Sequence, residues 1–240
     1  LTRMFGLEAV PSVPVLVRGQ VGVENRRLKL DGVELGLDDH RALVNGILSL
    51  EDGHAGTELQ VDLDIKDLNR FGGLFGVSDL PGQPLQLTTH LKPEGKGLAF
   101  QLKDDGRSQL RLDVDGRIAD MATPLGVDAT FDIGIPNISV LSFLAPPDTP
   151  WPDAPLKAAG RLVNERSNTR FDQVRLELGD MRATVDGKLH HDQRFDLVLD
   201  VRGPDASVLE PWVGQPFLPE PYSLAVQASG KPSAFGLSNI

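Results

Sequence analysis

The sequence predicts a mainly β protein, in which repeated antiparallel strands form an elongated, curled sheet with one short helix per repeat of about 70 residues. Three observations lead to this prediction. Apolar and polar residues alternate over most of the 240 residues, which is typical of strands with one wet face. A Val-Asn/Asp-Gly motif recurs about every 70 residues, at Val44–Gly46, Val114–Gly116 and Val185–Gly187. The chain also has 25 Gly and 18 Pro, which punctuate the alternation with turns.

The repeated motif also predicts the domain organisation. Each copy follows an Arg at the start of its strand: Arg41, Arg111 and Arg182. A period of this length indicates that one supersecondary unit is stacked, so we expect function to belong to the surface of the whole array. The chain is interpreted as one elongated array over residues 1–240, with approximate repeats at 13–83, 84–154 and 155–221 and the start of a fourth at 222–240.

The alternation predicts about four strands in each repeat. In the first repeat the inward apolar residues lie within 13–21, 28–30, 33–37, 42–50 and 59–65. In the second they lie within 85–91, 98–102, 110–118 and 127–135, and in the third within 156–162, 174–178, 183–189 and 195–201. Short polar segments separate many of these runs, which predicts antiparallel hairpins.

A short helix of about two turns is expected after the strands of each repeat. These helices begin at Asp67, Asn137 and Asp205, whose short side chains can accept from the free N–H groups of a helix start. Apolar residues follow at three-residue spacing, and proline-rich segments then end each repeat. Trp151 and Trp212 lie beside these segments, and we expect them to pack a helix over the sheet.

The glycine of each motif falls in the interior of a strand. The favoured interpretation of Gly46, Gly116 and Gly187 is a bulge or bend that lets the sheet coil. A second interpretation, compatible with the first, is that a position without a side chain admits a ligand.

Composition and charge exclude several classes of function. The formal charge is −10, from 34 acidic and 24 basic residues, and no Lys/Arg cluster occurs, which argues against nucleic acid as a partner. It also argues against an electrostatic clamp on anionic membranes. The chain has no Cys, so disulfides and thiolate metal sites are excluded. No segment approaches the about 18–20 apolar residues of a membrane helix, and the first residue is Leu1, so we expect an internal fragment of a longer protein.

We expect no enzyme, and we predict no catalytic residue, metal site or cofactor. Asp38-Asp39-His40 and His190-His191-Asp192 are the local groups that suggest metal or acid–base chemistry. Both lie where turns are expected, and neither recurs at the matching position of another repeat. The sequence also lacks a phosphate-binding Gly loop and a nucleophile motif.

The apolar face of the strands needs a cover that one short helix per repeat cannot provide. The sheet could close into a barrel, fold against a second sheet, or curl into a gutter whose floor holds an apolar ligand. The repeat favours the gutter, and the barrel stays open as an alternative. The predicted groove residues are Val15, Val17, Leu28, Leu30, Val44, Leu48, Val61, Leu63, Leu87, Phe100, Leu112, Val114, Phe131, Ile133, Leu176, Val185, Leu197 and Leu199.

The order of motifs resembles a known family. A Leu-x-Leu-Gly strand at Leu176–Gly179 precedes an Arg-Ala-x-Val-x-Gly strand at Arg182–Gly187. A Phe-Asp-Leu-x-Leu-Asp-Val strand at Phe195–Val201 and an Asp-x-Ser-x-Leu helix at Asp205–Leu209 follow, and an earlier copy begins at Leu35. From about residue 13 to residue 233 the sequence resembles the repeat region of the AsmA-like proteins of Gram-negative bacteria, which are relatives of TamB.

This resemblance implies a β-taco with an apolar lumen in a protein that is anchored in the inner membrane and extends through the periplasm. The function it implies is a bridge-like lipid-transport module, which shelters phospholipid acyl chains and supports outer-membrane biogenesis. The implied partners are phospholipids, the two membranes through terminal regions outside this sequence, and outer-membrane assembly proteins. The alternative is a periplasmic scaffold or assembly factor for outer-membrane proteins, which binds its clients by strand addition.

Overall fold

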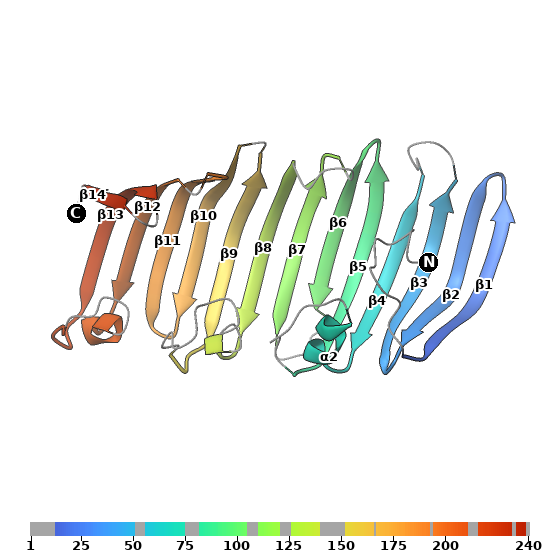
Figure 1. Ribbon diagram of the computed structural model, residues 1–240, viewed down its shortest axis with the longest axis horizontal. Coiled ribbons are helices and arrows are strands. Elements are labelled where there is room, and N and C mark those ends of the chain that lie inside the picture. Colours follow the sequence, from blue (N-terminus) through green and yellow to red (C-terminus); the bar gives the residue numbers. More distant parts are fainter. Residues whose placement is uncertain are drawn as a thin grey trace.

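The computed structural model describes residues 13–50, 56–74, 82–104, 110–120, 126–139, 152–165, 167–192, 194–210, 216–231 and 234–238. Their fold is one 14-stranded sheet in which every strand pairs antiparallel with its neighbours in the sequence (Figure 1). The strands stand side by side along the long axis of the molecule, from β1 at one end to β14 at the other. The predicted fold class, an elongated and curled antiparallel sheet, is therefore confirmed.

The strands are β1 Val15–Glu24, β2 Arg27–Leu37, β3 His40–Ser49, β4 Glu58–Ile65, β5 Leu85–Glu94, β6 Gly97–Asp104 and β7 Arg111–Ile118. The array continues with β8 Val127–Ile135, β9 Leu156–Asn164, β10 Asn168–Leu178, β11 Met181–His190, β12 Phe195–Gly203, β13 Tyr222–Lys231 and β14 Ala234–Ser238. The runs predicted separately at 28–30 and 33–37 belong to one strand, β2.

The register of the sheet places one apolar residue of every strand in a single line, which we call the central row. Each member is directly opposite the next across a strand pair. The central row consists of Val21, Leu30, Gly46, Leu59, Leu91, Phe100, Gly116, Ala129, Leu162, Phe171, Gly187, Leu197, Ala228 and Leu237. Because side chains alternate between faces, a slip of one residue in any pair would move this apolar set to the other face, so the row specifies the register.

Short helices lie along one long edge of the sheet: α2 Leu68–Gly73 and the 3-10 helix η2 Ala206–Leu209 (Figure 1). The predicted N-caps are confirmed. The Oδ1 of Asp67 accepts from the backbone N–H of Arg70 at 3.0 Å, and the Oδ1 of Asp205 accepts from Ser207 N–H at 2.8 Å. In the second repeat, Asn137 Oδ1 accepts from Ser139 N–H at 2.9 Å.

Helix α2 has six residues, which is close to the two turns predicted. Two consecutive glycines end α2, and Gly is a poor helix former because it loses the most backbone entropy. The 3-10 helix η2 has four residues, Glu210 after it is also helical, and residues 211–215 lie outside the described part of the chain. Most of the segment predicted as the second helix, residues 140–144, lies outside the described residues, as do Trp151 and Trp212.

Tight side-chain packing is concentrated beneath α2. Leu68 and Phe71 of this helix pack against a buried cluster of Ile65, Leu85 and Leu87. Much of the remaining apolar face is half-buried. The chain has an accessible surface of 15553 Å², whereas a compact monomer of the same mass would have about 10,500 Å². The sheet is thus an elongated structure with a large open face.

Two copies of the repeated motif lie opposite a β-bulge in the preceding strand. Between β2 and β3 the register shifts at Gly32, which has φ 59° and donates its N–H to Asn45 Oδ1 at 2.8 Å. Between β10 and β11 it shifts at Gln173, which has φ 49° and donates its N–H to Asp186 Oδ1 at 2.7 Å. The Asn or Asp of the motif therefore satisfies a backbone donor that the bulge removes from the ladder.

The middle copy differs. Strands β6 and β7 pair without a register shift, and Asp115 accepts from the Gln101 side chain at 3.2 Å. A bulge therefore lies beside the first and third copies, in the strand before the glycine and not at the glycine itself, and the second copy has no bulge beside it. The sheet can continue without a bulge in that repeat because both strands have the same number of residues across the motif.

Replacing Asp186 with Ala should lower the free energy of unfolding by about 1–2 kcal/mol, because the N–H of Gln173 loses a charged acceptor. The matched control is Asp115→Ala, which removes an exposed contact between side chains and should cost at most about 0.5 kcal/mol. Urea unfolding of both variants checks this. Equal losses would mean that Asp186 does not support the bulge.

Candidate functional site

All of the predicted groove residues lie on one face of the sheet. Leu30, Phe100 and Leu197 belong to the central row. A second row next to it contains Val33, Val44, Val61, Thr89, Leu102, Val114, Phe131 and Gly160 in β2 to β9, and Val174, Val185, Leu199 and Val226 in β10 to β13.

A third row lies nearer the edge that carries the helices. It contains Val17, Leu35, Ala42, Leu63 and Leu87 in β1 to β5, and Leu112, Ile133, Ala158, Leu176, Ala183, Val201 and Leu224 in β7 to β13. The remaining predicted residues lie at the two ends of the strands, with Val15 opposite Leu37 and Leu28 opposite Leu48. The alternation in the sequence thus assigns every one of these side chains to the same face.

This face has almost no charge. Within the described strands it contains no Lys or Arg, and its one acidic residue is Asp104, at the end of β6 opposite Leu87. The other polar residues of this face are His40, Thr89, Asn164, Thr169 and Tyr222. The face therefore offers a continuous apolar surface along the length of the array.

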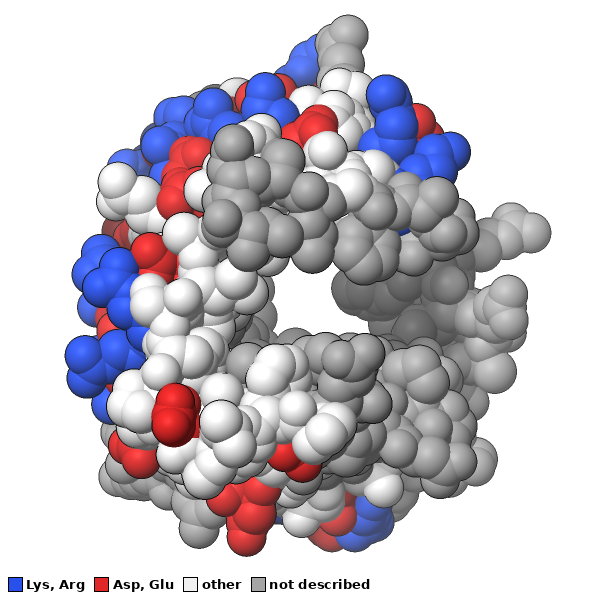
Figure 2. Space-filling view, turned by 90° about the vertical axis from the view of Figure 1, so that its left-hand side faces the viewer, with Lys and Arg blue, Asp and Glu red and all other residues white. Residues whose placement is uncertain are grey.

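The apolar face is the concave one. Seen along the long axis, the described residues curve around a central hollow, with the Lys, Arg, Asp and Glu side chains on the outer side (Figure 2). We call the concave apolar face the groove. Several of its side chains are open to solvent: Val17 is 67% exposed, Leu189 41% and Leu224 39%. The floor of the groove is thus not fully covered by the described part of the chain.

Ion pairs cover the convex face. The Arg161 guanidinium contacts Asp128 at 2.8 Å and, with Arg117 beside it, holds the pKa of the Asp128 carboxyl below its ordinary value. The Arg that opens each motif strand also lies on this face, where Arg111, for example, pairs with Asp132 at 3.0 Å. Exposed pairs of this kind contribute only about 0–1 kcal/mol each to stability. Their main consequence is that the convex face stays in contact with water, while the apolar face lies on the concave side.

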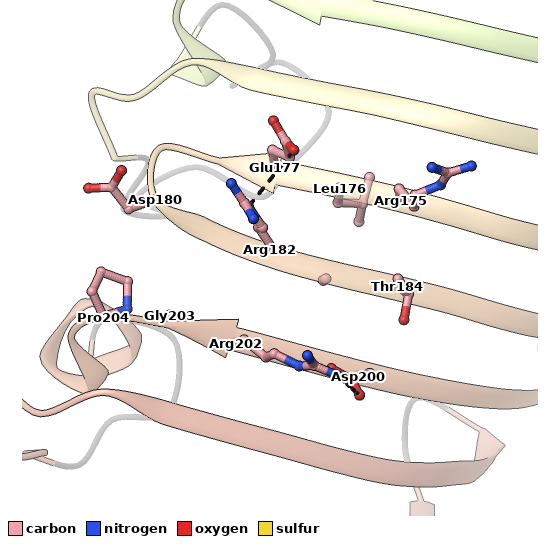
Figure 3. Close-up of a pocket in the computed structure, with 11 residues that line it drawn as sticks. Arg175, Leu176, Glu177, Asp180, Arg182, Thr184, Asp200, Arg202, Gly203 and Pro204 are labelled. Atoms are coloured by element: carbon pink, nitrogen blue, oxygen red, sulfur yellow. Dashed lines mark hydrogen bonds and ion pairs between the residues drawn. The ribbon is translucent and has the colours of Figure 1, made fainter.

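The convex face has shallow depressions but no constellation of catalytic type among the described residues. One depression of about 500 Å³ lies over β10, β11 and β12 and is lined by charged side chains (Figure 3). These side chains pair with one another, as Glu177 does with Arg182 at 3.9 Å and Asp200 with Arg202 at 2.8 Å. In the part of the chain that the structure describes, no group of three or more His, Asp or Glu side chains could hold a metal ion.

The candidate acid–base residues of the first turn have structural partners. Asp38 and Asp39 both pair with Arg70 of α2. His40 is 2% exposed, packs edge-on against the Phe71 ring with centroids 5.2 Å apart, and accepts from Lys66 N–H through Nδ1 at 3.2 Å. Sequence reasoning missed this role of His40 in seating α2, because Phe71 is distant in the sequence and gives no local signal.

The second candidate group is paired in the same way. His190 Nε2 lies 3.3 Å from Asp196, and Asp192 pairs with Arg194 at 2.7 Å. The exposed positions of Asp192 and Asp196 agree with the interpretation of this segment as a solvated turn.

The motif glycines do not open space for a ligand. A Cβ added to Gly46 or Gly187 would lie 2.1 Å from the carbonyl oxygen of Glu58 or Asp196, respectively. At Gly116 it would lie 2.8 Å from the Cζ of Phe100. Protein atoms already fill these positions, so the interpretation of the glycines as ligand sites is wrong, and their role is the close approach of neighbouring strands.

Fold and site together define the class of this protein: an open antiparallel β-gutter with an apolar concave face and a charged convex face. Comparison with protein-family models, with curated proteins and with solved structures finds no match to this chain. Within the described residues, no helix combines the length and the apolar character needed to cross a membrane.

Proposed function

We propose that this chain is a lipid-transport module whose groove shelters phospholipid acyl chains, with the head groups in water at the long edges of the sheet. The observation that carries the proposal is the unbroken central row, which crosses all 14 strands. The absence of Lys and Arg from the described part of this face supports it, because a fixed charge would have to be desolvated beside each passing chain.

The physical basis of binding is the removal of acyl CH₂ groups from water, which contributes about 0.8 kcal/mol for each group buried. Neighbouring strands are about 4.8 Å apart, so the 14 strands span roughly 60 Å. The hydrocarbon core of a bilayer is about 30 Å thick and contains two acyl chains end to end. The groove is about twice as long, so it has room for about four acyl chains end to end. Because successive positions are chemically alike, a lipid can slide without meeting a deep energy minimum.

The resemblance to AsmA-like proteins supports a more specific proposal about the cellular role. In it, the chain is part of a periplasmic bridge that is anchored to the inner membrane in the full-length protein and supports outer-membrane biogenesis. Its partners are phospholipids and, through other parts of that protein, the two membranes and outer-membrane assembly proteins. The alternative function, a scaffold that binds client proteins by strand addition, is favoured by one observation, the exposure of β1, which among the described strands pairs on one side only.

Native mass spectrometry of this chain, purified from a Gram-negative host, tests the proposal. We expect phospholipid to co-purify, because the groove side chains would otherwise face water. Lipid extraction before the measurement identifies the head groups, and delipidated protein supplies the unbound reference. A folded protein that carries no lipid would contradict the proposal and favour the scaffold.

A further inference from the structure

Strand β1 stands at one end of the row of described strands. All ten of its residues are exposed, and among the described strands it pairs only with β2. Its groove-facing valines are the most accessible of that face, with Val15 62%, Val17 67%, Val21 58% and Val23 72% exposed. Natural edge strands are often blunted by Lys, Pro or a bulge; β1 contains neither Lys nor Pro, and its one register shift against β2 lies at Gly19. Because no described strand pairs along the other side of β1, that side can accept another strand.

The sequence of β1 is complementary to itself when it is read in the antiparallel direction. If Gly19 faces Gly19 of a second copy, Val15 faces Val23 and Val17 faces Val21 on the groove side. On the convex side, Leu16 then faces Gly22 and Arg18 faces Gln20. Every valine meets a valine, and no two like charges are opposite each other, which is the favourable arrangement for cross-strand pairs.

Other registers are less favourable. A shift that puts Val15 opposite Val21 brings Arg18 opposite Arg18 of the second copy, and like charges in that position are destabilising. The opposite shift leaves Val15 without a partner in β1 and puts Val21 opposite Gly19. A shift of the pairing by one residue would place groove-facing side chains opposite convex ones. The register with Gly19 opposite Gly19 is therefore the most favourable one on both faces of the strand.

We propose that two copies of this chain associate through β1 in this register and form a symmetric dimer with one continuous sheet. The two-fold axis passes through Gly19 and is perpendicular to the sheet, so the grooves of both copies face the same side and join end to end. Closed two-fold pairs are the commonest form of protein association. The association needs no lipid, so it can be tested separately from the proposed function.

Sedimentation equilibrium of the full 240-residue chain tests the dimer. One strand pair is a small interface, so we expect a dissociation constant in the micromolar range, measurable between about 1 and about 100 µM. Val17→Lys and Val21→Glu should each weaken the dimer at least about tenfold, because each places two unpaired charges against valines. The double variant should restore association to within about threefold, because the new ammonium group of one copy would face the new carboxylate of the other.

Leu16→Lys is the matched control, since Leu16 is 45% exposed on the convex face, where its proposed neighbour is a glycine, and it should leave the dimer unchanged. Circular dichroism confirms that each variant is folded. A wild-type chain that stays monomeric up to the highest concentration overturns the proposal. So does a dimer that the single substitutions do not weaken, or a folded double variant that does not reassociate.

Discussion

Replacing Leu197 with Asp is expected to abolish most acyl-chain binding without unfolding the protein. Leu197 lies in the central row between Gly187 of β11 and Ala228 of β13, both of which are small, so its side chain forms a large part of the local floor. A carboxylate there must stay hydrated, and a bound acyl chain would remove that water. We expect the affinity for a fluorescent phospholipid to fall at least about tenfold, which corresponds to about 1.4 kcal/mol.

The neighbouring residue supplies the control for this experiment. Val198 belongs to the same strand but faces the convex side, where it is 55% exposed. Val198→Asp introduces the same charge opposite Asp186, and this like-charge pair should cost at most about 1 kcal/mol of stability. It should leave lipid affinity unchanged. If both variants bind lipid as tightly as the original protein, the groove is not the binding surface. If both lose lipid binding to the same extent, the substitutions have a general effect on the fold.

The largest effect on stability is expected for Gly187→Ala. The backbone of Gly187 has φ 138°, a conformation that residues with a side chain rarely adopt. The added methyl would also lie 2.1 Å from the carbonyl oxygen of Asp196, which is part of the paired strand β12 and cannot move without breaking the ladder. We expect a loss of about 3 kcal/mol or more in the free energy of unfolding.

Two other glycines make a graded comparison. Gly22→Ala places a methyl 3.9 Å from its nearest neighbour, the Cβ of Lys29, and should change stability by at most about 0.5 kcal/mol. Gly116→Ala should fall between the two, because Gly116 does not have the left-handed φ of Gly187. The nearest atoms to its added methyl would be Ala129 Cβ at 2.7 Å and Phe100 Cζ at 2.8 Å, which are less severe contacts than the one at Gly187. Urea unfolding measures all three. A Gly187→Ala protein as stable as Gly22→Ala would mean that the strand pair tolerates expansion at this point.

The local pattern of the sequence was sufficient to predict the strands, their antiparallel order and the face of each groove residue. Side chains of a strand alternate strictly, so residues such as Leu112 and Val114 must share a face whatever the rest of the fold does. Short hairpin turns then leave each strand little choice of partner. The helix starts at Asp67 and Asp205 were predictable for the same reason, because an N-cap depends on residues within one turn.

The bulges and the packing of His40 required the tertiary structure. A bulge is a mismatch in length between two paired strands, so neither strand shows it alone, and a positive φ at Gln173 has no signature in the residue type. The exposure of β1 likewise depends on which strands lie beside it. Alternation is a property of one strand and can be read from the sequence, whereas curvature and exposed edges arise from pairing between strands, which only the folded sheet determines.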